Sequence, residues 1–198
     1  MKTLIVSAIF ISFTFVSGQT KTNYEIINQL ISGSLVKVLS EYSEGEEKEK
    51  IVFKADFPDG YSVLKNRSFN FLHSLNPKVE LGTLNDFEDI SYTLEQISVD
   101  YGETFRKNIF SDYYSVREIK ISGTSVISKS GKKVPLPFSE SYSDTVAYDL
   151  LEQQQNNALP FTRGEIPEEP LFRSILEPAV ALTAAVVTIY LFFDVRSK

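Results

Sequence analysis

The chain carries few side chains whose type and spacing suit catalysis. His73 is the only histidine among the 198 residues, and cysteine is absent. An imidazole can activate a serine, but no Gly-x-Ser-x-Gly motif occurs, and no second histidine or cysteine thiolate is present to complete a zinc site. We therefore expect His73 to be a packing or surface residue. The sequence predicts no catalytic residue, no metal site and no cofactor.

One acidic cluster has two chemical alternatives. Asp86, Glu88 and Asp89 lie close together in the sequence, and calcium prefers several oxygen ligands of this kind. Their spacing matches no EF-hand loop, and a glycosidase-like carboxylate pair is the other alternative. We expect a solvated acidic loop, and both alternatives stay open.

A second cluster mixes aromatic rings with cations, a combination suited to burying area against a protein or a glycan. The predicted partner-binding residues are Phe105, Arg106, Phe110, Tyr113 and Tyr114, with Tyr101, Lys107 and Arg117 in the same segment. The alternative is that the rings fill the domain core while the cations extend to solvent.

The N-terminal residues 1–18 are typical of an export signal. Lys2 precedes an apolar run, and Val16-Ser17-Gly18 supplies small residues for signal peptidase. The run is about 14 residues, or roughly 21 Å of helix, which is short of a hydrocarbon core of about 30 Å. We predict cleavage before Gln19.

A longer apolar stretch lies near the C-terminus. Residues 175–193 would form roughly 28 Å of helix, enough to cross a bilayer. We therefore predict a transmembrane helix over 174–194 and a cytoplasmic tail over 195–198, an orientation that Arg196 and Lys198 favour. A buried C-terminal core helix is the alternative.

Particular residues of this stretch have expected roles. Pro178 is expected in the first turn of the membrane helix, following Glu177. Ala181 and Ala185 are small residues four apart that would admit a neighbouring helix. Tyr190 completes the predicted membrane-anchor residues.

Hydrophobic periodicity predicts the elements between the two ends. A helix begins at the capping box of Thr22 and Glu25, and Gly33 in its middle is expected to mark a close contact. It is followed by a strand over 51–57, a helix over 61–75, a short strand over 78–81, and a three-strand antiparallel meander over 90–101, 113–127 and 134–138. Pro135 and Pro137 restrict the last strand to an edge or a bulge.

These elements predict the fold class α+β. We expect a two-layer domain with helices packed on one face of a mainly antiparallel sheet, plus the C-terminal transmembrane helix. The exported domain is expected over 19–155, with a short helix capped by Ser143 or Asp144 near its end. The proline-containing segment 156–173 is predicted to be a linker to the membrane.

The order of export signal, leading helix, strand, helix and long hairpin resembles small periplasmic α+β modules of envelope assembly and secretion proteins. Examples are the curli secretion channel and the lipopolysaccharide assembly lipoprotein. Those relatives are commonly lipoproteins, and this chain departs from them because it has no cysteine and ends in an apolar helix. The resemblance carries no functional residue onto this chain.

Composition limits the classes of partner and the cellular locations to be expected for the chain. A net charge of −6 argues against nucleic acid as a partner, and an exported domain without cysteine suits a bacterial envelope better than a eukaryotic cell surface. We expect a non-catalytic, single-pass protein of the inner membrane, with its N-terminal domain in the periplasm. That domain would bind another exported protein or an envelope polymer, as an assembly or secretion accessory factor. The alternatives are a ligand-sensing subunit that signals through a partner membrane helix, and a carboxylate-dependent hydrolase.

Overall fold

The computed structural model describes residues 20–43, 49–82, 87–108, 111–129, 131–168 and 171–196. The predicted signal peptide 1–18 and the cleavage position before Gln19 lie outside the described residues, so both stay predictions.

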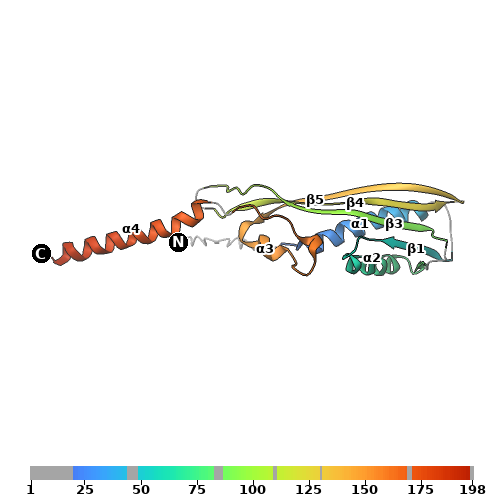
Figure 1. Ribbon diagram of the computed structural model, residues 1–198, viewed down its shortest axis with the longest axis horizontal. Coiled ribbons are helices and arrows are strands. Elements are labelled where there is room, and N and C mark those ends of the chain that lie inside the picture. Colours follow the sequence, from blue (N-terminus) through green and yellow to red (C-terminus); the bar gives the residue numbers. More distant parts are fainter. Residues whose placement is uncertain are drawn as a thin grey trace, which may run out of the picture.

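A five-stranded sheet organises the domain, with strand order β2-β1-β3-β4-β5 (Figure 1). Strand β1 is parallel to β2 and β3, whereas β3, β4 and β5 form the predicted antiparallel meander. A helix crosses between β1 and β2, as a parallel pair requires. The strands are β1 (Ile51–Asp56), β2 (Val79–Leu81), β3 (Ile90–Tyr101), β4 (Tyr114–Lys129) and β5 (Lys132–Ala147). The predicted mixed α+β class is confirmed.

Helices α1 (Asn23–Ser43) and α2 (Ser62–Leu75) provide the second layer. The alternate residues of the strands face them, so the core lies between the helices and one face of the sheet. The fully buried side chains from both layers include Ile26, Ile27, Leu35, Phe53, Leu64, Leu72, Ile90, Tyr92, Leu94 and Ile119. The other face of β4 and β5 carries mainly serine, threonine and charged side chains.

The predicted capping box begins α1. The Thr22 backbone N–H donates to Glu25 Oε2 at 2.8 Å, and the Glu25 backbone N–H donates to Thr22 Oγ1 at 3.2 Å. These bonds satisfy backbone donors that a helix start leaves free. The expectation for Gly33 is wrong, because a Cβ built there would meet nothing within 4 Å.

Strand β3 contains an irregularity that changes which residues face the core. The register with β4 shifts between Leu94 and Gln96. Before the shift, Tyr92 and Leu94 are buried; after it, Val99 is. An extra residue in one strand reverses the alternation beyond it, which is how a β-bulge re-aims side chains.

Strand β5 lies at the edge of the sheet, as its two prolines predict. It pairs with β4 over the whole register from Tyr114↔Ala147 to Lys129↔Lys132. Gly131 has a φ of 75° in the turn that joins them, a backbone conformation that glycine adopts at no steric cost.

The segment after β5 differs from the prediction. Ser143 and Asp144 do not cap a helix but lie within β5, and the chain continues into the 3₁₀ turn η1 (Tyr148–Leu150) and the short helix α3 (Leu151–Gln154). The predicted linker is also partly wrong, since residues of η2 (Pro160–Thr162) pack on the domain. Phe161 is only 5 % exposed, and its ring lies 4.9 Å from that of Tyr61. Burial of this large ring outweighs the linker-like composition around it.

The C-terminal helix α4 spans Leu171–Arg196. Within the described part of the chain, no helix has both the length and the apolar character that crossing a membrane would require. The predicted transmembrane helix is therefore not supported by the structure. Pro178 is also not in the first turn as expected, because the helix begins at Leu171.

Candidate functional site: the aromatic–cation surface

Four of the five predicted partner-binding residues lie together beside the start of β4. Phe105 and Tyr114 form an isolated antiparallel bridge in which each backbone N–H donates to the other residue's carbonyl oxygen at 2.8 Å. Their ring centroids are 6.3 Å apart. The bridge folds the segment after β3 back onto β4, and this brings Arg106 and Tyr113 to the same place.

Two cations cover the neighbouring aromatic rings. The Arg106 guanidinium carbon lies 5.4 Å from the centroid of Tyr113, and Lys107 Nζ lies 5.9 Å from that of Tyr114. Both distances fall within the range of a cation–π attraction. The backbone is fixed as well, because the N–H groups of Lys107 and Asn108 both donate to Ser111 Oγ at 3.1 Å.

We call Phe105, Arg106, Lys107, Tyr113 and Tyr114 the aromatic–cation surface. Phe105 is 38 % exposed, Lys107 is exposed, and the remaining three are half-buried. Phe110 lies outside the described residues, so its predicted place on this surface stays a prediction. The surface presents apolar rings with positive charge around them and no carboxylate among its members.

Arg117 belongs to a different feature, although the sequence places it near these residues. Its side chain is 0 % exposed, and it is the largest fully buried side chain described. Its Nε donates to Asp144 Oδ1 at 2.9 Å and its Nη2 to Asp144 Oδ2 at 2.6 Å. This bidentate pair joins β4 to β5 at directly opposed positions.

The same guanidinium holds the start of the domain. Arg117 Nη1 donates to the Lys21 carbonyl oxygen at 2.9 Å and to Asn23 Oδ1 at 2.8 Å. Asn23 Nδ2 in turn donates to Tyr101 Oη and to the Thr162 carbonyl oxygen, both at 2.8 Å. The five residues Asn23, Tyr101, Arg117, Asp144 and Thr162 form what we call the arginine clamp.

The clamp perturbs the phenols around it. Burial raises the pKa of Tyr101, opposed by the hydrogen bond from Asn23. Burial also raises the pKa of Tyr142, and the nearby Asp144 carboxylate adds to the effect. Both phenols therefore stay protonated, which suits a structural network. Sequence reasoning missed the clamp; its only signal was an arginine and an aspartate at inward-facing positions of two adjacent strands.

The acidic cluster is divided by the structure. Asp86 lies outside the described residues. Glu88 makes ion pairs with Lys54 at 3.4 Å and Lys133 at 3.0 Å, and the hydrogen bond from Lys133 is the main reason that its pKa is lowered. Asp89 Oδ2 accepts the backbone N–H of Val52 at 2.8 Å. Glu88 and Asp89 therefore tie strands together, and among the described residues no three carboxylate or imidazole side chains gather as a metal site.

His73 packs at the end of α2. Its Nδ1 lies 2.9 Å from the carbonyl oxygen of Val79, and its ring stacks on Phe69 with centroids 5.8 Å apart. The contacts connect α2 to β2. His73 is exposed, so it is a surface residue that also packs on its neighbours, as expected.

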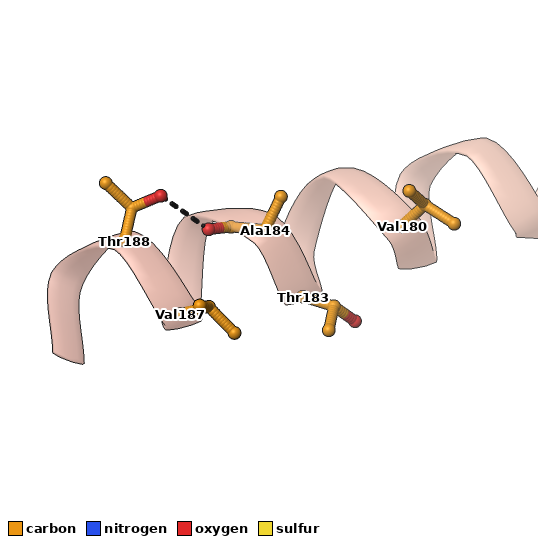
Figure 2. A pocket seen from close by; sticks show the side chains of 5 residues that line it. All are labelled: Val180, Thr183, Ala184, Val187 and Thr188. Atoms are coloured by element: carbon orange, nitrogen blue, oxygen red, sulfur yellow. Dashed lines mark hydrogen bonds between the residues drawn. The ribbon is translucent and has the colours of Figure 1, made fainter. Parts of the chain in front are cut away.

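A hollow of about 570 Å³ lies open on the surface of α4. It is lined by Val180, Thr183, Ala184, Val187 and Thr188 (Figure 2). Thr188 Oγ1 donates to the Ala184 carbonyl oxygen of its own helix at 2.7 Å. No charged group lines this hollow, so it offers apolar contact without acid–base chemistry.

Comparison with known proteins adds two distant structural likenesses. The minor lipoprotein from Acinetobacter baumannii is similar at a TM-score of 0.35 and 16 % identity, over 59 % of this chain and 82 % of that one. The rare lipoprotein B from Shewanella oneidensis is similar at a TM-score of 0.32 and 13 % identity, over 71 % of this chain and 98 % of that one. No protein-family model and no curated protein sequence matches the chain. The likenesses are too low to assign a residue or a function.

Proposed function

We propose that this chain is a non-catalytic protein of the bacterial cell envelope. Its exported α+β domain binds another exported protein or an envelope polymer, and helix α4 attaches it to the inner membrane. The observation that carries the proposal is the aromatic–cation surface. The other polar features described above, the arginine clamp with Glu88 and Asp89, make contacts within the domain.

The composition of this surface suits a binding role. Tyrosine, phenylalanine and arginine are enriched where proteins contact one another, because aromatic rings bury a large area with little loss of rotamer freedom. The cation–π contacts and the backbone bonds to Ser111 Oγ hold the groups in place before any partner arrives. A surface that is already ordered loses less entropy on binding.

Attachment through α4 rests on its apolar residues. Described side chains around the whole circumference of the helix are exposed, with Leu182 67 %, Val187 50 % and Phe193 69 % exposed. No charged residue occurs between Val180 and Phe193. Exposed apolar side chains of this kind are stabilised by a non-aqueous environment, and contact with a bilayer would provide one.

Affinity capture tests the binding surface. The detergent-solubilised full chain should recover one partner stoichiometrically, and combining Phe105→Ala with Arg106→Glu and Lys107→Glu should reduce that recovery at least tenfold. Phe87→Ala is a matched control, because this ring is 97 % exposed and lies outside the surface. Equal recovery by the surface variant and the control would reject this surface as the binding site.

An alkaline carbonate wash of isolated membranes tests the attachment. The protein should remain in the membrane pellet, and Val187→Arg should move it toward the supernatant, since a charge in the apolar part of a helix opposes insertion by about 2.5–3.5 kcal/mol. Val116→Arg, on the exposed face of β4, is the control and should stay in the pellet. Recovery of the wild-type protein in the supernatant would contradict the proposed attachment to the membrane.

A further inference from the structure

Among the described residues, β4 is the strand that pairs with β5, and the outer side of β5 has no strand beside it. The hydrogen-bond pattern identifies which backbone groups face that outer side. The Tyr148 backbone N–H donates to the Tyr113 carbonyl oxygen at 2.9 Å, one position beyond the pair Tyr114↔Ala147. Because bonding residues alternate along an antiparallel pair, the even-numbered residues of β5 bond to β4. The odd-numbered residues direct their N–H and C=O groups away from the sheet.

The two prolines lie on this outward row. Pro135 and Pro137 therefore remove two donors from the free edge, a device by which proteins prevent edge pairing. The row continues without proline through Ser139, Ser141, Ser143 and Thr145. Half of the edge is thus blocked, and the other half keeps both its donors and its acceptors.

The unblocked half carries no unneutralised charge in the contacts that the structure shows. Glu140 pairs with Lys37 of α1, and Asp144 is held by Arg117. The outward residues themselves have small hydroxyl side chains on the open face of the sheet. Figure 1 shows β5 as the outermost strand, and β4 is the strand it pairs with. A hollow of about 320 Å³ lies between α1 and residues 136–140 of β5.

We propose that β5 pairs antiparallel with β5 of a second copy of this chain, about a two-fold axis at Ser141. This register places Ser141 opposite itself and Ser139 opposite Ser143 of the other copy. Thr145 then lies opposite Pro137, whose carbonyl can still accept the threonine N–H. The pairing joins two five-stranded sheets into one continuous sheet.

Self-complementarity is the argument for a second copy as the occupant. The even-numbered residues of β5 direct their side chains to the helix side of the sheet. With the axis at Ser141, they pair Glu140 with Tyr142 and Phe138 with Asp144 across the two copies, so no like charges oppose one another. Two-fold symmetric dimers, in which the same patch of both copies forms the interface, are also the commonest homo-oligomers. Moving the axis to Ser139 would place both prolines opposite serines, nearer the centre of the pairing, where each missing donor interrupts the ladder.

Cysteine cross-linking of the detergent-solubilised full chain tests the register directly, because the natural sequence contains no cysteine. In a hydrogen-bonded antiparallel pair the two Cα atoms lie about 5.5 Å apart, within the range that a disulfide can bridge. Under mild oxidation, Ser141→Cys should give a covalent dimer as the main product. Ser122→Cys is the matched control: it faces the same side on β4, opposite Ser139, and should stay monomeric.

Further variants separate edge pairing from association through α4. Adding Ser139→Pro to Ser141→Cys should lower the cross-linking rate at least tenfold, whereas adding Pro137→Ser should raise it by restoring a donor. Circular dichroism should show that each variant keeps its sheet. Equal cross-linking by Ser122→Cys and Ser141→Cys, or no cross-linking of Ser141→Cys with a monomeric mass by light scattering, would overturn the proposal. A monomeric mass without cross-linking would mean that the edge of β5 is free to pair with a strand of another protein. Neither result depends on the aromatic–cation surface, so the proposed function is tested separately.

Discussion

Arg117 shows how one residue can be assigned to the wrong feature by its neighbours in sequence. It lies three positions after Tyr114, yet alternation along β4 directs it to the opposite face of the strand. Its guanidinium donates four hydrogen bonds, to Asp144, Asn23 and Lys21. A buried cation is tolerated because its donors are used in this way.

Removing this cation should be among the most damaging single changes in the domain. Arg117→Met should lower the free energy of unfolding by about 3 kcal/mol, since it leaves a carboxylate and two other acceptors without their donor. Urea denaturation followed by circular dichroism measures the change. In the double variant with Asp144→Leu, the loss should be smaller than the sum of the two single losses. A loss below about 1 kcal/mol in the single variant would contradict the structural role of the clamp.

Glu88 gives a prediction about pH. Because its folded-state pKa is lowered from the usual 4.5, mainly by the hydrogen bond from Lys133, it stabilises the fold above that pH. The contribution is lost as the pH falls through the lowered value. Glu88→Gln should therefore destabilise the protein at pH 7 by less than about 1 kcal/mol, as exposed ion pairs do. The difference from wild type should vanish near pH 2, as urea midpoints at the two pH values would show. A difference that grows on acidification would contradict the assignment.

At the scale of elements, β3 approaches β4 closely at Gly123, which pairs with Leu94 beside the bulge. A Cβ added there would lie 2.2 Å from the Thr93 carbonyl oxygen and 2.6 Å from Phe138 Cζ. Glycine is therefore required by the space available on β4 and not by its own backbone angles.

Two glycine-to-alanine changes should have opposite signs. Gly123→Ala should cost about 1–3 kcal/mol, because the backbone of β3 and the ring on β5 must both shift. Gly33→Ala, in the middle of α1 with open space around it, should stabilise the protein by about 0.5–1 kcal/mol. Thermal unfolding of both variants provides the comparison. The same sign for both would show that the packing around β4 is more adaptable than the distances indicate.

Sequence periodicity predicted both helices, the five strands and the edge position of β5, because each depends on local patterns or on proline chemistry. It did not predict the strand order, since pairing between β1 and β3 depends on contacts distant in sequence. It also left residues 156–162 as linker, because Phe161 is buried against Tyr24 of α1 and Tyr61, which are distant in the sequence. For the candidate site, the sequence identified the aromatic–cation surface but not the clamp, whose members come from five separate segments.

At the scale of the whole molecule, the start and the end of the domain are held together by Asn23. Its amide bonds to Arg117, to Tyr101 and to the Thr162 carbonyl oxygen. The segment that leads to α4 therefore leaves the domain close to where residues 20–22 enter it.

Substitution of Asn23 should loosen this connection without unfolding the sheet. Asn23→Ala should cost about 2 kcal/mol, the usual effect of leaving buried partners unsatisfied. It should also speed proteolysis within residues 156–168, while β4 and β5 stay intact. Limited proteolysis followed by mass spectrometry identifies the cut positions. Unchanged cleavage in that segment would show that Phe161 alone anchors it.

The hairpin of β4 and β5 extends away from this junction. Each strand has 16 residues. Arg117 and Asp144 of the clamp are 14 and 13 residues from Gly131, so the turn lies about 45 Å from the clamp at roughly 3.3 Å per residue. If the membrane holds one end and a load acts at the other, tension runs lengthwise along the strands. The inter-strand hydrogen bonds would then bear the load together, in shear, and would not break one at a time. A hairpin of this length is therefore expected to be stiff along its long axis, whereas the aromatic–cation surface lies at its other end, beside the junction.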